Sequence, residues 1–315
     1  MRWKRFLLAA VLAFTAMAAA SAQRLSGTYM YAQRDTCRLF FDVYEPAPEA
    51  ECTLEGHAKP TLLFVFGGGF IGGYRSNQSY MPWFKILTED GYRVITIDYR
   101  LGLKGVKMDF SLKGKIQTAR NTIKAEYMGV EDLFAAVNYI LDNQEALGVE
   151  PDNIVLAGNS SGAIISLAAE LSICNGDSYA AVLPEGFNFK GLISFAGAIV
   201  GDQGVPKYKR APCPTLLMHG TEDELVQYDK TQVLKLGMWG TNVLDDIYQA
   251  NGYPYCVYRF RGHAHDIADN FVPLWPFQKY FLEQNVLLGQ NVFIDAFIDD
   301  PNIPKKDAPT LESLY

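Results

Sequence analysis

The 315-residue sequence predicts an α/β fold with a mainly parallel central sheet and helices on both faces. Short runs rich in β-branched and aromatic residues alternate along the chain with longer stretches of helical periodicity. Most of the short runs are continuously apolar, which suits strands that are buried on both faces. The composition is that of an ordinary globular protein, with 49% apolar and 20% charged residues.

Seven segments are expected to be strands. RLFFDVY (38–44) alternates at a period of two and is expected at an edge of the sheet. The continuous apolar runs are 61–66, 93–98, 153–158, 191–197, 215–220 and 255–260. The helices expected between them lie around 79–90, 129–147, 161–172, 227–250 and 274–288. This order predicts right-handed crossovers within one domain.

The N-terminal residues have the features of a secretory signal peptide. MRWKR is basic, FLLAAVLAFTAMAAA is apolar but too short for a membrane span, and ASA places small residues before a cleavage site after Ala22. We therefore expect residues 1–22 to be removed, leaving a single domain of residues 23–315. The protein is then expected to be periplasmic or secreted, with no stable membrane anchor.

Loss of the signal peptide removes three basic residues and changes the formal net charge from −7 to −10. Such an acidic protein is not expected to bind nucleic acid. Export also implies an oxidising compartment, where Cys37 and Cys52, which flank one predicted strand, are the expected disulfide pair. The chain has no Cys-x-x-Cys motif and only four histidines, so no metal site is expected.

Two segments interrupt the regular alternation of strands and helices. Residues 101–128 form a long connection with many basic residues and partial helical character. A functional insertion and a solvated surface excursion fit this segment equally well. Residues 290–315 follow the last expected helix, and their polar, proline-containing end is expected to pack loosely.

The stretch LAGNSSGAII contains a Gly-x-Ser-x-Gly pattern centred on Ser160, between an apolar strand and an apolar helix. This is the context of a nucleophile elbow, in which a sharp turn exposes the serine and the glycines avoid collisions with the neighbouring strand and helix. The pattern alone fits equally well an ordinary turn in which Ser160 caps the helix.

A glycine-rich loop, FGGGFIGG (66–73), follows the expected strand 61–66. Consecutive glycines let backbone N–H groups point into a shared cavity, where they stabilise the negative oxygen of an acyl-transfer transition state. A phosphate-binding loop would continue into a helix, or into a lysine followed by serine or threonine. GGGFIGGYR does not continue in that way.

An acidic residue of the kind that completes a catalytic triad follows the strand 215–220, in HGTEDELV. Asp223 lies in the loop at the carboxyl end of this strand, where a triad acid belongs. Glu222 and Glu224 are neighbouring candidates for the same role. A solvated acidic turn is the alternative interpretation.

The base is expected in RGHAHDI (261–267). Of the four histidines, His57 comes too early in the chain, and His219 ends a strand, where a structural role is expected. His263 and His265 remain. The order serine, acid, histidine is that of the α/β-hydrolases and differs from the orders of chymotrypsin and subtilisin.

With these motifs in order, the sequence resembles an α/β-hydrolase of the esterase/lipase type, close to the hormone-sensitive-lipase-like and carbohydrate-esterase groups. Six segments carry the resemblance and cover most of residues 38–290. They are LFFDVYEP, KPTLLFVFGGGFIGG, VITIDYRLG, NIVLAGNSSGAIISLAA, PTLLMHGTEDELV and RFRGHAHDI. The resemblance implies an α/β-hydrolase fold.

The resemblance also implies the site residues. The implied triad is Ser160, Asp223 and His265, and the implied oxyanion hole consists of the backbone N–H groups of Gly68, Gly69 and Ser161. His265 is preferred over His263 because the family has its histidine three residues after the first glycine of the last loop, here Gly262. Phe66 departs from the pattern, since the family has a loop-supporting histidine there. Asn159 departs too, since an acidic residue is common before the serine.

The activity implied is hydrolysis of carboxylic esters through an acyl-enzyme, without a metal or organic cofactor. The substrate would be a small-molecule or carbohydrate ester. Export, the acidic charge and aromatic residues (Trp83, Trp239, Tyr74 and Tyr99) favour acetyl or feruloyl esters on carbohydrate, although core packing also explains such aromatics. The alternatives are a serine peptidase of the same fold, often with an added propeller domain, and a catalytically inactive binding module, which typically lacks the serine or the histidine.

Overall fold

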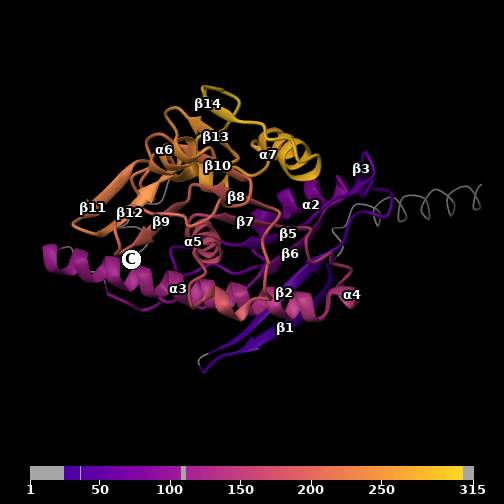
Figure 1. Cartoon of the computed structure of the whole chain (residues 1–315), viewed down its shortest axis with the longest axis horizontal. Coiled ribbons are helices and arrows are strands. Elements are labelled where there is room, and N and C mark those ends of the chain that lie inside the picture. The colour runs from indigo at the N-terminus through magenta and orange to yellow at the C-terminus, as the bar shows by residue number, and fades with distance from the viewer. Residues whose placement is uncertain (1–24, 36, 108–110, 308–315) are drawn as a thin grey trace, which may run out of the picture.

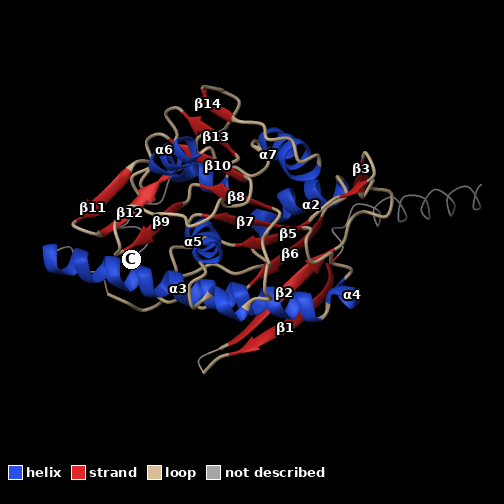
Figure 2. Cartoon of the chain, viewed as in Figure 1, coloured by secondary structure: helices blue, strands red, loops and turns tan. Residues whose placement is uncertain are grey.

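The computed structural model describes residues 25–35, 37–107 and 111–307. The expected signal peptide lies outside these residues. A nine-stranded sheet runs through the middle of the molecule, with helices on both sides (Figures 1 and 2). In order across the sheet, its strands are β1 (Leu25–Gln33), β2 (Arg38–Tyr44), β6 (Arg93–Ile97), β5 (Thr61–Val65), β7 (Ile154–Asn159), β8 (Gly191–Phe195), β10 (Thr215–Gly220), β13 (Tyr255–Phe260) and β14 (Ile294–Ile298).

The sheet is mainly parallel, as the sequence predicts. The seven strands from β6 across the sheet to β14 pair with one another in parallel. Strand β2 is antiparallel to both of its neighbours, β1 and β6. All seven strands expected from the sequence are present in it. The arrangement confirms the predicted α/β-hydrolase fold class.

The helices lie between successive strands. The α-helices are α2 (Met81–Glu89), α3 (Leu112–Asp142), α4 (Gln144–Leu147), α5 (Ser161–Asn175), α6 (Thr241–Asn251) and α7 (Trp275–Phe281). Short 3₁₀ helices are η1 (Gln78–Tyr80), η2 (Ala180–Val182) and η3 (His265–Asp269), and η4 (Leu282–Leu287) is a π-helical turn. Helices α3 and α5 cover one face of the sheet, and α2 and α7 cover the other (Figure 1).

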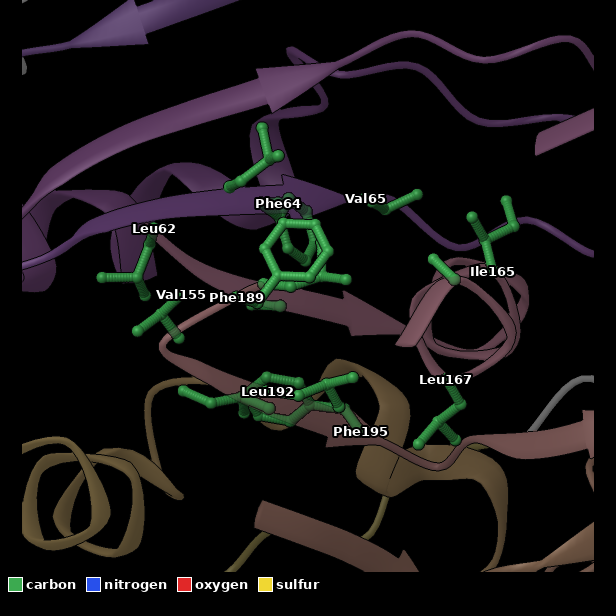
Figure 3. Packing of buried hydrophobic residues seen from close by; sticks show 14 of the residues in the cluster. Leu62, Phe64, Val65, Val155, Ile165, Leu167, Phe189, Leu192 and Phe195 are labelled. Carbon is green, nitrogen blue, oxygen red and sulfur yellow. The ribbon is translucent and has the colours of Figure 1, made fainter. Parts of the chain in front are cut away.

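The core forms because the parallel strands are apolar on both faces. Every residue of β5, β7, β8, β10 and β13 is buried. Figure 3 shows apolar side chains of β5, β7 and β8, among them Phe64 and Phe195, gathered in this interior, with Ile165 and Leu167 of α5 beside them. Burial of such side chains contributes about 1.5–3 kcal/mol each. The rigid sheet fixes where the loops at its carboxyl edge begin.

The edge position expected for 38–44 is wrong. Strand β2 lies between β1 and β6, and β1 occupies the edge. The pairing is stabilised by aromatic contacts, since the rings of Tyr29 and Tyr31 stack on Phe41. The alternation of apolar and polar residues in β2 therefore reflects its position beside β1, which is partly exposed.

The region 227–250, expected to be helical, is helical only in its second half. It contains β11 (Lys230–Val233) and β12 (Leu236–Gly240), which form a small antiparallel sheet with β9 (Ala198–Gly201). A second small pair joins β3 (Thr53–Leu54) to β4 (His57–Ala58). Glycine disfavours helix, and a Cβ at Gly240 would lie 1.8 Å from the carbonyl oxygen of Gln227. This close backbone approach explains the glycine that ends β12.

The segment 101–128 is largely part of a helix. Helix α3 begins at Leu112, where the Ser111 hydroxyl accepts a hydrogen bond from the Gly114 N–H at 3.1 Å. Within the tail 290–315, β14 pairs with β13, Ile303 is buried, and the Asn270 side chain donates to the Pro304 carbonyl. Strand β14 thus belongs to the sheet, whereas residues 299–307 are exposed apart from Ile303, and residues 308–315 lie outside the described residues.

Candidate active site

Ser160 occupies the turn between β7 and α5. Its φ of 52° and ψ of −123° lie outside the usual regions for a non-glycine residue, a strain of about 1–3 kcal/mol. The Ser160 N–H donates to the Phe195 carbonyl at 2.9 Å, which ties the turn to the neighbouring strand. The packed sheet thus holds the serine in the conformation of a nucleophile elbow.

Both glycines of the Gly-x-Ser-x-Gly pattern are required by space. A Cβ at Gly158 would lie 2.4 Å from the carbonyl oxygen of Gly162, and a Cβ at Gly162 would lie 2.0 Å from that of Val65. These are backbone atoms of the helix and of β5, so no side-chain rotation relieves the collision. The physical reason given for the pattern from the sequence is confirmed.

His265 lies between Ser160 and Asp223. Its Nε2 is 2.8 Å from Ser160 Oγ, and its Nδ1 is 2.7 Å from Asp223 Oδ2. The three residues follow β7, β13 and β10, whose carboxyl ends meet at one edge of the sheet. Because Asp223 accepts the Nδ1–H, the Nε2 of a neutral imidazole is left to accept the serine proton. The structure therefore brings together the three residues predicted for the triad.

The Asp223 carboxylate is buried and fully hydrogen-bonded. Its Oδ1 accepts the backbone N–H groups of Leu225 and Val226, both at 3.0 Å. Burial acts to raise the pKa of this carboxyl, but hydrogen bonds from His219 and His265 outweigh it and hold the pKa well below its usual range. Asp223 is therefore ionised at neutral pH.

His219 contacts the carboxylate of Asp223, which was not expected from the sequence. This histidine is completely buried, and its Nε2 lies 3.1 Å from Asp223 Oδ2 and 3.0 Å from the Val226 carbonyl. Both partners are acceptors, so Nε2 carries the proton, and Nδ1 faces the Thr241 hydroxyl at 2.9 Å. Its spacing of four residues from Asp223, across the end of β10, is the signal that indicates the contact.

The other candidates from the sequence do not join Ser160. Glu222 and Glu224 are exposed on either side of the buried Asp223. His263 is buried and directs Nδ1 to Asp266 Oδ2 at 2.6 Å. Of the two histidines in this loop, His265 is the one hydrogen-bonded to the serine.

The glycine loop follows β5 and turns sharply beside the elbow. Gly68 and Gly69 have φ values of 140° and 62°, and the Gly68 carbonyl accepts the N–H groups of Ile71 and Gly72. In the described part of the chain, the backbone N–H groups of Gly68, Gly69 and Ser161 donate no hydrogen bond. These are the three groups that the sequence resemblance implies as oxyanion donors.

Several other expectations concern metals, disulfides and the membrane. Among the described residues, no group of three or more His, Cys, Asp or Glu side chains is arranged to hold a metal ion. Cys52 carries a free, exposed thiol, so the disulfide expected between Cys37 and Cys52 is not formed. Within the same described ranges, no helix has the length and hydropathy needed to cross a bilayer.

A family model described as the carboxylesterase family matches residues 4–185, more than half of the chain. The chain belongs to the carboxylesterase family. The matched part contains the glycine loop and Ser160 but ends before Asp223 and His265. The esterase/lipase resemblance noted from the sequence is thereby confirmed, while the second half of the site rests on the structure.

Curated relatives match this carboxylesterase-family chain over part of their length. Bile salt-activated lipase of Bos taurus is 27% identical over 129 residues, which cover 39% of this chain and 19% of the lipase. Acetylcholinesterase of Gallus gallus is 34% identical over 104 residues, covering 33% of this chain and 12% of that enzyme. Para-nitrobenzyl esterase of Bacillus subtilis is 28% identical over 149 residues, covering 47% and 27%. The chain thus matches about a quarter or less of these relatives' length.

Solved structures show the same fold over most of the chain. Esterase 2 of Thermogutta terrifontis in its apo form has a TM-score of 0.57 at 17% sequence identity, covering 83% of this chain and 96% of that one. Its propionate-bound form gives a TM-score of 0.57 at 19% identity, covering 82% and 93%. The likeness extends the fold assignment beyond the part that the family model matches.

Proposed function

We propose that the protein is a serine-dependent hydrolase of carboxylic esters. The observation that carries the proposal is the hydrogen-bonded series from Ser160 through His265 to Asp223, held at a strained elbow. Ser160 Oγ attacks the ester carbonyl carbon while its proton passes to His265 Nε2. The tetrahedral intermediate then expels the alcohol, which takes the proton from His265, and leaves an acyl-enzyme.

Hydrolysis of the acyl-enzyme repeats the same steps with water as the nucleophile. His265 accepts a proton from the water as the water oxygen attacks the acyl carbon. The new intermediate then expels Ser160 Oγ, which takes this proton back from His265, and the carboxylic acid leaves. The ionised Asp223 holds the imidazole in the required tautomer and stabilises its transient positive charge. The free N–H groups of Gly68, Gly69 and Ser161 are proposed to bind the negative oxygen of both intermediates.

Labelling with a fluorophosphonate probe and hydrolysis of p-nitrophenyl acetate test this proposal. We expect the wild type to be labelled and Ser160→Ala to be neither labelled nor active, with kcat lower on the order of 10⁶-fold. Ser172→Ala is the matched control, since Ser172 is a buried serine near the other end of α5. Labelling of Ser160→Ala at the wild-type rate would contradict the assignment.

For the substrate, we propose acetyl or feruloyl esters on carbohydrate, cleaved in the periplasm or outside the cell. The signal-peptide pattern and the acidic net charge support this choice. The aromatic residues support it less, because Trp83, Trp239 and Tyr99 are buried and only Tyr74 is exposed. Stacking on sugars therefore falls to Tyr74 among these four.

Initial rates on acetylated, feruloylated and plain aliphatic esters test the substrate class. We expect kcat/KM for the carbohydrate esters to exceed that for aliphatic esters of the same acyl group. Equal values would contradict carbohydrate recognition. Faster cleavage of the matching amides would favour the serine peptidase alternative.

A further inference from the structure

We propose that Asn159 and Tyr99 are positioning residues that hold the glycine loop (66–73) in register with Ser160. They act through hydrogen bonds on the two sides of the nucleophile, and they fix where the N–H groups of the loop point. The inference rests on the proposed ester hydrolysis, because it assigns the residues that set the oxyanion hole of that reaction.

Asn159 joins three parts of the site with one side chain. It is buried at the end of β7, directly before Ser160. Its Oδ1 accepts the Gly67 N–H at 2.7 Å, and its Nδ2 donates to the Ala268 carbonyl at 3.1 Å. Ala268 belongs to η3, the short helix that begins with His265. The amide therefore ties the glycine loop and the histidine-bearing helix to the strand that carries the serine.

Only an amide meets both requirements at this position. An ionised carboxylate accepts the Gly67 N–H but has no hydrogen to donate to the Ala268 carbonyl. It would also face Asp269, whose Oδ1 lies 3.4 Å from the Asn159 Nδ2. Asn159 supplies one acceptor and one donor without adding charge to a buried site.

Tyr99 makes the second connection, on the other side of Ser160. Its ring stacks on Phe66 with the centroids 4.5 Å apart, and its hydroxyl donates to the Phe66 carbonyl at 3.0 Å. The same hydroxyl oxygen lies 3.2 Å from Ser161 Oγ. Because the phenol proton is directed to the carbonyl, the Ser161 hydroxyl is the donor in this second contact. Tyr99 thus links the residue before the glycines to the residue after the nucleophile.

The loop needs such external support because its own conformation is strained. Phe70, a bulky residue, has a φ of 62° directly after Gly68 and Gly69. Gly67 is packed so closely that a Cβ there would lie 2.9 Å from Asn159 Nδ2. A loop in this state keeps its geometry only while its surroundings determine it. Loss of either connection should therefore move the N–H groups of the loop without removing them.

Kinetics of Asn159→Leu and Tyr99→Phe test the proposal. We expect kcat to fall about 10–100-fold in Asn159→Leu and about 3–10-fold in Tyr99→Phe, with KM changed less than about threefold. Affinity for a trifluoromethyl ketone, which forms an oxyanion on Ser160, should fall in parallel with kcat/KM. A residue that only stabilises the fold would lower neither quantity in the folded protein.

Two matched controls separate positioning from stability. Asn153→Leu removes a buried asparagine with comparable hydrogen bonds at the opposite end of β7. Tyr92→Phe removes a buried phenol oxygen that has no hydrogen-bond partner among the described residues. We expect both controls to keep the wild-type kcat. A fall in kcat in these controls equal to that of Asn159→Leu and Tyr99→Phe overturns the proposal.

Hydrogen exchange gives a readout that does not require activity. We expect the Gly67 amide to exchange at least about tenfold faster in Asn159→Leu, because its acceptor is gone. Unchanged exchange overturns the proposal even in an active enzyme. A wild type that hydrolyses no ester contradicts the proposed function, whereas the exchange rates still decide whether Asn159 holds the loop.

Discussion

Each histidine of the last loop contacts an aspartate, and only one of these two pairs reaches the serine. His265 Nδ1 is 2.7 Å from Asp223 Oδ2, and His263 Nδ1 is 2.6 Å from Asp266 Oδ2. All four side chains are buried. By the length of the contact and by burial the pairs are equivalent, yet only His265 has its other nitrogen on Ser160.

The difference lies in where each aspartate comes from. Asp266 is three residues from His263 and also accepts the Ala264 N–H and the Asn270 amide, so this pair closes a local turn. Asp223 comes from the loop after another strand, 42 residues earlier than His265. In both pairs the contact uses Nδ1 and leaves Nε2 over, but only the imidazole held from the separate loop has its Nε2 on Ser160. A short His–Asp contact is therefore insufficient to identify a catalytic base.

The largest effect is expected from the two histidines. His265→Ala should lower kcat for ester hydrolysis on the order of 10⁶-fold, because the serine loses its base. His263→Ala should leave kcat within about tenfold and instead cost about 1–3 kcal/mol of unfolding free energy. Hydrolysis rates and denaturant unfolding of both variants test the distinction. If only His263→Ala abolished hydrolysis, the two pairs would have to exchange roles.

The aspartates sharpen the same comparison with smaller effects. Asp223→Asn should lower kcat about 10⁴-fold, since the amide favours the wrong imidazole tautomer. Asp266→Asn should change kcat less than about tenfold, because its partner does not touch the serine. Measurements of kcat for both variants test this difference, after circular dichroism has confirmed that both are folded. Equal losses would show that the local pair also acts on the reaction.

The carboxyl group of Glu126 shows how burial without hydrogen bonds changes a pKa. Glu126 on α3 is 2% exposed, and its Oε2 has no hydrogen-bond partner within the described residues. Burial raises its pKa well above the ordinary value. The contrast with Asp223 follows from hydrogen bonding, since desolvation acts in the same direction on both groups.

The smallest expected effect is that of Glu126 on the free energy of unfolding. Because the folded pKa of Glu126 is raised, the folded protein keeps this proton above the pKa of the unfolded chain, about 4.3, where the unfolded chain releases it. Folding therefore loses stability as pH rises from that value toward the raised folded pKa. Glu126→Gln removes this loss. We expect it to be about 1–3 kcal/mol more stable than the wild type near pH 8 and no more stable near pH 4. Urea unfolding at the two pH values measures the difference, and a pH-independent difference would contradict the assignment.

Much of the site was predictable because its motifs are local. The order of strand, glycine loop, strand and elbow follows from residues adjacent in sequence, and so do the positions of Ser160, Asp223 and His265. The family resemblance, through the spacing from Gly262, favoured His265. The contacts of Asn159 and Tyr99 were missed, because each bridges segments that only folding brings together. The contact of His219 with Asp223 spans only four residues and could have been inferred from that spacing.

The peripheral elements were harder to predict for a related reason. Strands β1 and β14 have mixed burial, and their pairing is decided by the edges of a sheet that already exists. Strands β11 and β12 lie in a stretch that also fits a helix, and pairing with β9 decides between the two. Propensity is a weak prior where tertiary contacts can compensate.

The sequence by itself determined the fold class, the central parallel strands and the serine, acid and histidine loops that meet at their carboxyl edge. These follow from hydrophobic periodicity and from glycines that are required wherever backbone segments approach closely. Tertiary structure alone decided which histidine of the last loop faces Ser160 and which groups support the glycine loop. Hydrogen bonds of this kind form only when separate loops are positioned to within a few tenths of an ångström, and packing sets those positions.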